Sequence, residues 1–152
     1  MKELSVGSPA PDFSLPANDG KTYSLKELRG KKIVLYFYPK DDTSGCTKES
    51  CSFSENIFSI KKKGALVLGV SADSVKSHQK FVEKYALQFP LLSDVSKEML
   101  QAYGVLQQKS MFGKKYIGIV RTTFIIDEKG NIAHIFPNVK VDGHTQEVLN
   151  VL

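Results

Sequence analysis

Two short apolar runs, at residues 33–38 and 65–71, constrain the fold of this chain more than any other feature. Both are rich in β-branched and aromatic side chains, with few polar interruptions, and such runs are typical of strands in a sheet that is covered on both faces. Between them, apolar residues from Cys51 to Ile60 recur mostly at three- and four-residue intervals, which predicts an amphipathic helix that ends at Lys61–Gly64. Strand, helix and strand in this order indicate an α/β fold.

The remaining segments extend this pattern with turn, helix and strand signals. The predicted elements are a hairpin of residues 13–15 and 22–25 outside the main core, a helical turn at 25–30, helices at 74–85 (capped by Asp73 or Ser74), 97–103 and 145–152 (capped by Asp142 or His144), a short strand or turn at 89–94, a loop at 105–114, and an antiparallel hairpin of 116–126 and 131–136. This order predicts a single domain over residues 1–152 with a thioredoxin-like α/β fold. We expect a central mixed β-sheet flanked by helices, with an N-terminal β-hairpin extension.

Composition favours a globular protein without a membrane span. The chain has 152 residues, of which 41% are hydrophobic and 24% charged, and no apolar run approaches the length that crosses a bilayer. The first ten residues lack the continuous apolar core of a secretory signal, so a cytoplasmic protein is expected. The net charge of +5 comes from short lysine clusters without a nucleic-acid-reading motif. We therefore expect neither nucleic acid nor a membrane as partner.

The chain contains two cysteines, Cys46 and Cys51, which are too few for a disulfide scaffold or a cysteine-only zinc site. Pro39 ends the first apolar run because proline cannot donate to a strand ladder. Residues 41–45 then supply turn and N-cap side chains for a helix that begins near Cys46. The simplest interpretation of an arbitrary cysteine is a small buried hydrophobe, but this placement favours a reactive thiol.

A thiol in the first turn of a helix faces unpaired N–H groups and the positive end of the helix dipole, which favour the nucleophilic thiolate. An ordinary cysteine is only about 3% ionised at pH 7, so full ionisation gains roughly 30-fold, or about 2 kcal/mol. Faster attack on an O–O bond requires donors aimed at both oxygens. Thr43 and Arg121 are candidates, although Thr43 could be a plain N-cap and Arg121 a surface cation.

Two motifs resemble those of the peroxiredoxins. Pro39-x-x-x-Thr43-x-x-Cys46 is similar to the peroxiredoxin active-site motif, and residues 121–127, Arg-Thr-Thr-Phe-Ile-Ile-Asp, resemble the arginine-bearing strand of that family. The Tyr-Phe-Tyr-Pro-Lys-Asp run at 36–41, the Cys-Thr-Lys-Glu run from Cys46 followed by Cys51, and the Ala-Pro-Asp-Phe sequence at 10–13 are similar to the PrxQ, or bacterioferritin comigratory protein, branch. The resemblance covers almost the whole chain.

The resemblance implies an antioxidant, thiol-dependent peroxidase that reduces hydrogen peroxide and organic hydroperoxides without a metal or another cofactor. In it, Cys46 would be the peroxidatic cysteine, Thr43 would hydrogen-bond the peroxide, Arg121 would stabilise the thiolate and the transition state, and Pro39 would shield the pocket from water. Thioredoxin or a related thiol protein would be the reductant, and the protein would act as a monomer or weak homodimer. Ser44 departs from the pattern, because many relatives have proline there.

Cys51 is the expected resolving cysteine. If both cysteines lie in one regular helix, their Cα atoms are roughly 8 to 9 Å apart, beyond the about 7 Å that a disulfide tolerates. The start of the helix must therefore unwind before Cys51 can condense with a Cys46 sulfenic acid. The alternative is an inert cysteine on the helix surface, with resolution by an outside thiol.

Two other functions are compatible with a pair of cysteines. A protein thiol-disulfide oxidoreductase would be expected to have Cys-x-x-Cys, whereas four residues separate the cysteines here. A redox-sensing or holdase-like module could use the same switch without turnover. His78, His134 and His144 lack the spacing of metal ligands and are expected to be structural or exposed. No glycine-rich phosphate loop is present, so neither a nucleotide nor a flavin is expected.

Overall fold

The structure of the chain is a computed structural model that describes residues 4–152. Residues 1–3, which belong both to the expected domain and to the N-terminal segment compared with a secretory signal, lie outside the described residues. The elements in chain order are β1 (Ser14–Pro16), β2 (Thr22–Ser24), the 3-10 helix η1 (Lys26–Leu28), β3 (Lys32–Phe37), α1 (Ser44–Glu55), α2 (Ile57–Lys62), β4 (Ala65–Ser71), α3 (Val75–Tyr85), β5 (Leu91–Ser93), α4 (Glu98–Ala102), β6 (Leu106–Met111), β7 (Lys114–Ile119), β8 (Thr122–Ile126), β9 (Ile132–Phe136) and α5 (His144–Val151).

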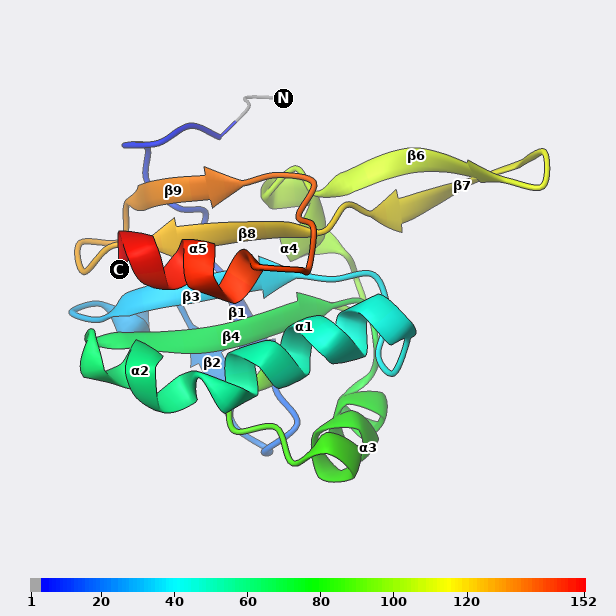
Figure 1. Cartoon of the computed structure of the whole chain (residues 1–152). Helices are drawn as coiled ribbons and strands as arrows, with labels where there is room; N and C mark the ends of the chain where they lie inside the picture. The colour runs from blue at the N-terminus through cyan, green and yellow to red at the C-terminus, as the bar shows by residue number, and fades with distance from the viewer. Residues whose placement is uncertain (1–3) are drawn as a thin grey trace.

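A mixed sheet of five strands in the order β5-β4-β3-β8-β9 forms the centre of the molecule (Figure 1). β3 pairs with β4 in parallel and with β8 antiparallel, so it is the middle strand. Its side chains alternate between two buried faces: Ile33, Leu35 and Phe37 enter one hydrophobic cluster, and Val34 and Tyr36 enter the other. A strand buried on both faces has to be apolar throughout, which explains the first apolar run of the sequence.

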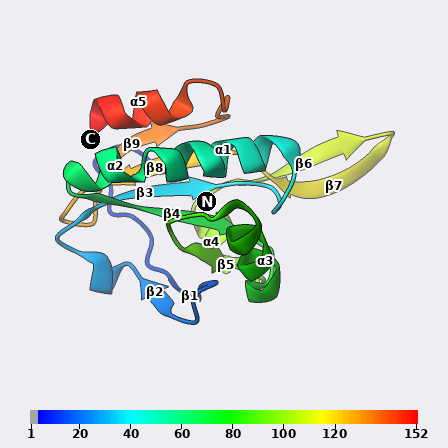
Figure 2. The same ribbon diagram turned by 60° about the horizontal axis from the view of Figure 1, so that its bottom comes forward.

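Different elements cover the two faces of the sheet. Figure 2 shows α1 and α5 on one side, and α4 with the β1–β2 hairpin on the other. Phe53 of α1 and Val148 of α5 pack in the same cluster as Tyr36, whereas Leu100 of α4 packs with Phe37. The predicted mixed sheet flanked by helices, with its N-terminal hairpin, is therefore confirmed.

The helix predicted between the two apolar runs is interrupted, so it forms α1 and α2 instead of one element. Asn56 separates them with a non-helical backbone (φ −103°, ψ 11°). Its side-chain amide donates to the carbonyl of Ser52 at 2.8 Å, and its backbone N–H contacts the carbonyls of Ser52 and Phe53, both at 3.2 Å. An asparagine side chain that competes for a backbone carbonyl favours such a break.

Three further predictions were wrong in detail. Residues 105–114 are not a loop, because β6 pairs with β7 in an antiparallel ribbon that projects from the body (Figure 1). The predicted strand 116–126 is accordingly divided at Val120 and Arg121 into β7 and β8. The N-cap of α5 is Gly143, with φ 78°, and neither Asp142 nor His144.

No helix formed by residues 4–152 is long and apolar enough to cross a lipid bilayer.

Candidate active site

Cys46 lies where the middle strand of the sheet delivers the chain to a helix. β3 ends at Phe37, residues 38–43 form a short connection, and α1 begins at Ser44. Cys46 is therefore in the first turn of α1, where backbone N–H groups have no partner within the helix. Its side chain is buried, with 1% of its surface exposed, and it is a free thiol.

Arg121 and Glu49 surround this sulfur. Arg121 Nη2 donates to Cys46 Sγ at 3.3 Å, and Arg121 Nη1 donates to Glu49 Oε1 at 2.7 Å. Glu49 stands three residues after Cys46 on α1, so both side chains lie on the same face of the helix. The guanidinium thus bridges the thiol and a buried carboxylate from across the sheet.

Burial and the neighbouring charges shift the pKa values of Glu49 and Arg121 in opposite directions. Burial raises the pKa of Glu49 to about 7, although Arg121 lowers it. Within residues 4–152, Glu49 Oε2 has no hydrogen-bond partner, which is why the buried anion is only partly stabilised. Burial also lowers the pKa of Arg121, but Glu49 and Cys46 outweigh that effect and hold it above its usual value. The guanidinium therefore stays charged beside the sulfur.

Gly45 makes the contact between Arg121 and Cys46 possible. A Cβ atom at this position would lie 3.2 Å from Arg121 Nη2, closer than ordinary van der Waals contact. The absence of a side chain on the preceding residue lets the guanidinium lie directly over the first turn of α1. The sequence indicated the arginine and the cysteine, but nothing in it marked this glycine.

Thr43 and Pro39 lie at the exposed edge of the site. Both are solvent-exposed. Thr43 is the residue before α1, and its Oγ1 donates to the carbonyl of Lys40 at 2.9 Å instead of capping the helix. The plain N-cap interpretation of Thr43 is therefore wrong for its side chain, while its backbone carbonyl accepts the first helical bond, from Thr47 N at 2.8 Å.

Cys51 lies on α1, five residues after Cys46, and is also a free thiol. It is partly buried, and burial together with Glu55 raises its pKa. Both cysteines belong to one helix that extends from Ser44 to Glu55. The helical geometry therefore keeps their Cα atoms roughly 8 to 9 Å apart, too far for a disulfide.

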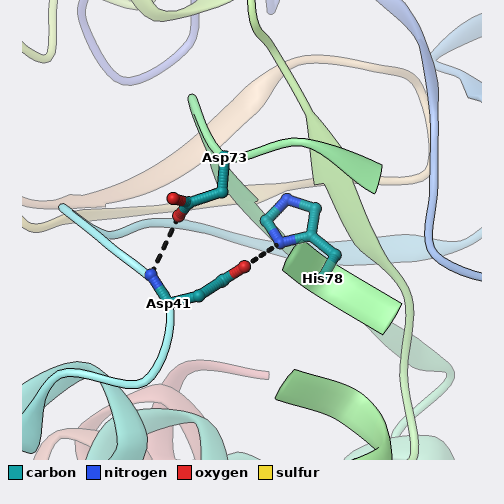
Figure 3. Close-up of side chains that lie close together, drawn as sticks. All are labelled: Asp41, Asp73 and His78. Atoms are coloured by element: carbon teal, nitrogen blue, oxygen red, sulfur yellow. Dashed lines mark hydrogen bonds and ion pairs between the residues drawn. The ribbon is translucent and has the colours of Figure 1, made fainter. Parts of the chain in front are cut away.

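A buried polar cluster beside the site was missed by the sequence analysis. Asp41, in the connection before α1, lies against His78 of α3 and Asp73 (Figure 3). One ligand-type atom from each of these three residues lies within 4.8 Å of the others, a spacing that could hold a metal ion. All three side chains already form hydrogen bonds within the protein. His78 and His144 are both buried.

Comparison with known proteins assigns the chain to a family. The model of the AhpC/TSA family matches residues 6–135. A Bcp-type peroxiredoxin of Coxiella burnetii is 54% identical over 149 residues, covering 98% of this chain and 99% of that protein. Peroxiredoxin Bcp of Escherichia coli is 42% identical and covers 100% and 97%. The solved bacterioferritin comigratory protein of Xanthomonas campestris superposes with a TM-score of 0.90 at 38% identity, with 96% of each chain covered.

The chain therefore belongs to the AhpC/TSA family, and within it to the Bcp, or PrxQ, branch of the peroxiredoxins. It is a thiol-dependent peroxidase, an oxidoreductase whose substrates are a peroxide and a thiol reductant. The thioredoxin-like fold predicted from the sequence is the fold of these relatives.

Proposed function

We propose that Cys46 is the peroxidatic cysteine and that Arg121 is its principal electrostatic partner. The observation that carries this proposal is the 3.3 Å contact between Arg121 Nη2 and Cys46 Sγ at the start of α1. The thiolate attacks the terminal oxygen of hydrogen peroxide or an organic hydroperoxide. An S–O bond forms as the O–O bond breaks, and the departing oxygen leaves as water or an alcohol after it takes up a proton. A fixed cation beside the sulfur stabilises the charge that moves onto the oxygens.

Thr43 and Pro39 complete the proposed pocket. Thr43 donates its hydroxyl proton to the carbonyl of Lys40, so it does not serve as the donor expected from the sequence, and the lone pairs of its Oγ1 accept a hydrogen bond from the peroxide instead. Pro39 has no N–H group and limits the access of water from the exposed side. Organic hydroperoxides are included because the work on the Xanthomonas relative concerns alkyl peroxide reduction.

Cys51 is the proposed resolving cysteine. Its thiol attacks the sulfur of the Cys46 sulfenic acid, an S–S bond forms, and the hydroxyl group leaves as water. The roughly 8 to 9 Å helical separation requires the first turns of α1 to unwind before this bond forms. An external dithiol protein such as thioredoxin then reduces the disulfide and is itself oxidised.

The proposed cycle uses the residues of one chain. Cys46, Cys51 and Arg121 all come from the same copy, so a monomer or weak homodimer suffices, and residues 1–152 are proposed to act as one domain. We assign the reaction to the cytoplasm, because that compartment supplies reduced thiol proteins. The cycle includes no metal ion and no organic cofactor.

Stopped-flow measurement of peroxide consumption with a thioredoxin system tests the proposal. Cys46→Ser should abolish turnover. Cys51→Ser should retain the first oxidation but lose the peroxide-induced intramolecular disulfide, which mass spectrometry detects. Insulin-disulfide reduction serves as the comparison assay, because a protein oxidoreductase would be active there. Unchanged peroxide turnover in Cys46→Ser would refute the assignment, and persistence of the disulfide in Cys51→Ser would exclude Cys51 as its partner.

A further inference from the structure

The connection that carries Thr43 is fastened at a buried aspartate. Asp41 has 8% of its surface exposed, although its neighbours Lys40 and Asp42 are exposed. A carboxylate is costly to bury unless charged or polar partners compensate it. The surroundings of Asp41 therefore have to supply such partners, and they fix this point of the connection.

Four groups hold Asp41 in place. Tyr38 OH donates to Oδ1 at 2.5 Å, and Ser77 Oγ donates to Oδ2 at 2.8 Å. His78 Nδ1 lies 2.7 Å from the same Oδ2. The backbone N–H of Asp41 donates to Asp73 Oδ2 at 2.8 Å (Figure 3). We name these contacts of Asp41 the Asp41 clasp.

His78 connects the clasp to β5, an edge strand of the central sheet. Its ring is fully buried, and its Nε2 lies 2.9 Å from the carbonyl oxygen of Leu92 in β5. Because a carbonyl only accepts hydrogen bonds, Nε2 is the donor in this contact. The ring is thus fixed at both nitrogens. It links Asp41, two residues before Thr43, to α3 and β5.

The contacts that hold α1 are separate from those of the clasp. Near its start, Cys46 and Glu49 both accept hydrogen bonds from Arg121, whereas every partner of Asp41 lies outside α1. Local unwinding of α1 breaks the first set of contacts and none of the second, and a buried hydrogen-bonded network is costly to break. Unwinding that begins after the clasp would therefore disturb α1 and leave Asp41 in place.

We propose that Asp41 and His78 are positioning residues of the peroxidase reaction. They hold the connection in the geometry that presents Thr43 to the peroxide, and they oppose the spread of α1 unwinding toward β3. The clasp thereby sets the balance between two steps with opposite demands, because reaction with peroxide needs the folded site and disulfide formation needs the unwound one. The second half of this inference rests on the proposed Cys51 cycle.

Paired substitutions at adjacent residues provide the test. Asp41→Asn preserves shape but weakens the clasp, whereas Asp42→Asn changes an exposed carboxylate that contacts Lys84 and Tyr85. Asparagine tolerates the left-handed conformation of Asp42, with φ 56°. Competition with a haem peroxidase gives the rate constant with hydrogen peroxide. Rapid acid quench, thiol alkylation and mass spectrometry give the rate of disulfide formation.

For Asp41→Asn we expect the peroxide rate constant to fall by about tenfold or more and disulfide formation to accelerate by about threefold or more, with both rates of Asp42→Asn within about twofold of wild type. Ser77→Ala removes one donor of the clasp and should shift both rates in the same directions by less, which keeps the test available if Asp41→Asn does not fold. The proposal would be overturned if Asp41→Asn left the peroxide rate constant and the rate of disulfide formation unchanged, if it lowered both in equal proportion, or if Asp42→Asn changed both rates as much as Asp41→Asn does. If oxidised wild-type protein formed no Cys46–Cys51 disulfide, the proposed cycle would be contradicted. The peroxide rate constant of Asp41→Asn would still test whether the clasp positions Thr43.

Discussion

At the scale of single residues, the guanidinium of Arg121 reaches Cys46 because position 45 has no side chain. Gly45→Ala places a Cβ atom 3.2 Å from Arg121 Nη2, so the guanidinium has to shift by a few tenths of an ångström, and we expect this shift to weaken its contact with the sulfur. Alanine also favours the helix by up to about 1 kcal/mol over glycine. We expect peroxide reduction to slow by about tenfold, or about 1.4 kcal/mol, while the free energy of unfolding stays equal or rises. Peroxide kinetics and urea denaturation measure the two quantities.

Ser44→Ala is the matched control for this substitution. Ser44 is exposed and begins the same helical turn, so its replacement should change neither quantity appreciably. Full activity in Gly45→Ala would show that the close approach of Arg121 does not contribute to the rate. A loss of activity that only accompanies a loss of stability would mean that the variant reports on folding instead.

The raised pKa of Glu49 makes stability depend on pH in a defined direction. The group has an ordinary pKa of 4.5 and a pKa of about 7 in the fold, so folding favours its protonated form. Its contribution is fully present below about pH 4.5 and is lost as the pH rises through about 7. The limit of this effect is about 3 kcal/mol, reduced in practice by whatever relaxation accompanies ionisation.

Glu49→Gln removes this titratable group and should show whether its ionisation lowers or raises the free energy of unfolding. Glutamine can still accept from Arg121, so the variant should gain stability relative to wild type between pH 5 and pH 8. Urea unfolding of both proteins at the two pH values gives the comparison, in which groups common to both proteins cancel. A stability difference that is the same at both values would contradict the raised pKa.

The residues of the site differ in how far the sequence could reveal them. Cys46 and Arg121 were indicated by motifs, whereas their contact joins residues 75 apart and required the tertiary structure. Glu49 stood within a quoted motif without an assigned role, and its place three residues after Cys46 was the available signal. Asp41 likewise stood within the motif at 36–41 without an assigned role, and His78 gave no local signal, because burial of an aspartate in a connection depends on what packs against it.

At the scale of elements, the strands of the central sheet were predictable and the β6–β7 ribbon was not. Two-residue hairpin turns usually contain asparagine, aspartate or glycine at the positions with positive φ. Here the turn is made by Phe112 and Gly113, with φ values of 53° and 77°. Phenylalanine rarely adopts this conformation, and its side chain is 98% exposed. The usual signal was therefore present only at Gly113, and the segment was interpreted as a loop.

Gly69 in β4 leaves room for the side chain of Tyr36, which contacts α1. A Cβ atom there would lie 2.6 Å from Leu91 and 2.8 Å from the ring of Tyr36, and Tyr36 OH lies 2.8 Å from Ser50 Oγ of α1. Gly69→Ala should lower the free energy of unfolding by about 1 to 3 kcal/mol through overpacking. Guanidinium denaturation measures the loss.

Gly118→Ala in the β6–β7 ribbon is the control for Gly69→Ala. The atoms nearest to its added Cβ are Cδ of Lys109 at 2.9 Å and Cε2 of Tyr116 at 3.1 Å, both in side chains of the ribbon outside the hydrophobic core. They can shift, at most at the cost of the hydrogen bond from Lys109 Nζ to the carbonyl of Ile119, so we expect a loss of no more than about 1 kcal/mol. Equal losses in the two variants would indicate a general cost of alanine in place of a strand glycine, and not a specific clash with Tyr36.

At the scale of the whole molecule, the proposed cycle combines a stable sheet with one helix end that unwinds. β3 and β4 are almost wholly buried, and elements buried in this way open only with the largest part of the fold. The start of α1 instead follows the C-terminal end of β3, between the Asp41 clasp and Phe53. Phe53 is fully buried, with its ring centroid 4.9 Å from that of Tyr36, so it should limit unwinding on the C-terminal side.

Hydrogen exchange of the reduced and oxidised proteins tests these two limits. Formation of the Cys46–Cys51 disulfide should remove protection from amides 47–51, whose helical hydrogen bonds begin with Thr47 N, and leave β3, β4 and α2 protected, because the roughly 8 to 9 Å helical separation of the cysteines cannot contain that bond. Cys51→Ser treated with one equivalent of peroxide is the control, since its sulfenic acid does not enforce unwinding. Unchanged protection of amides 47–51 in the oxidised protein would show that the disulfide forms without local unwinding. Loss that extends through β3 would show instead that the clasp and Phe53 do not confine it.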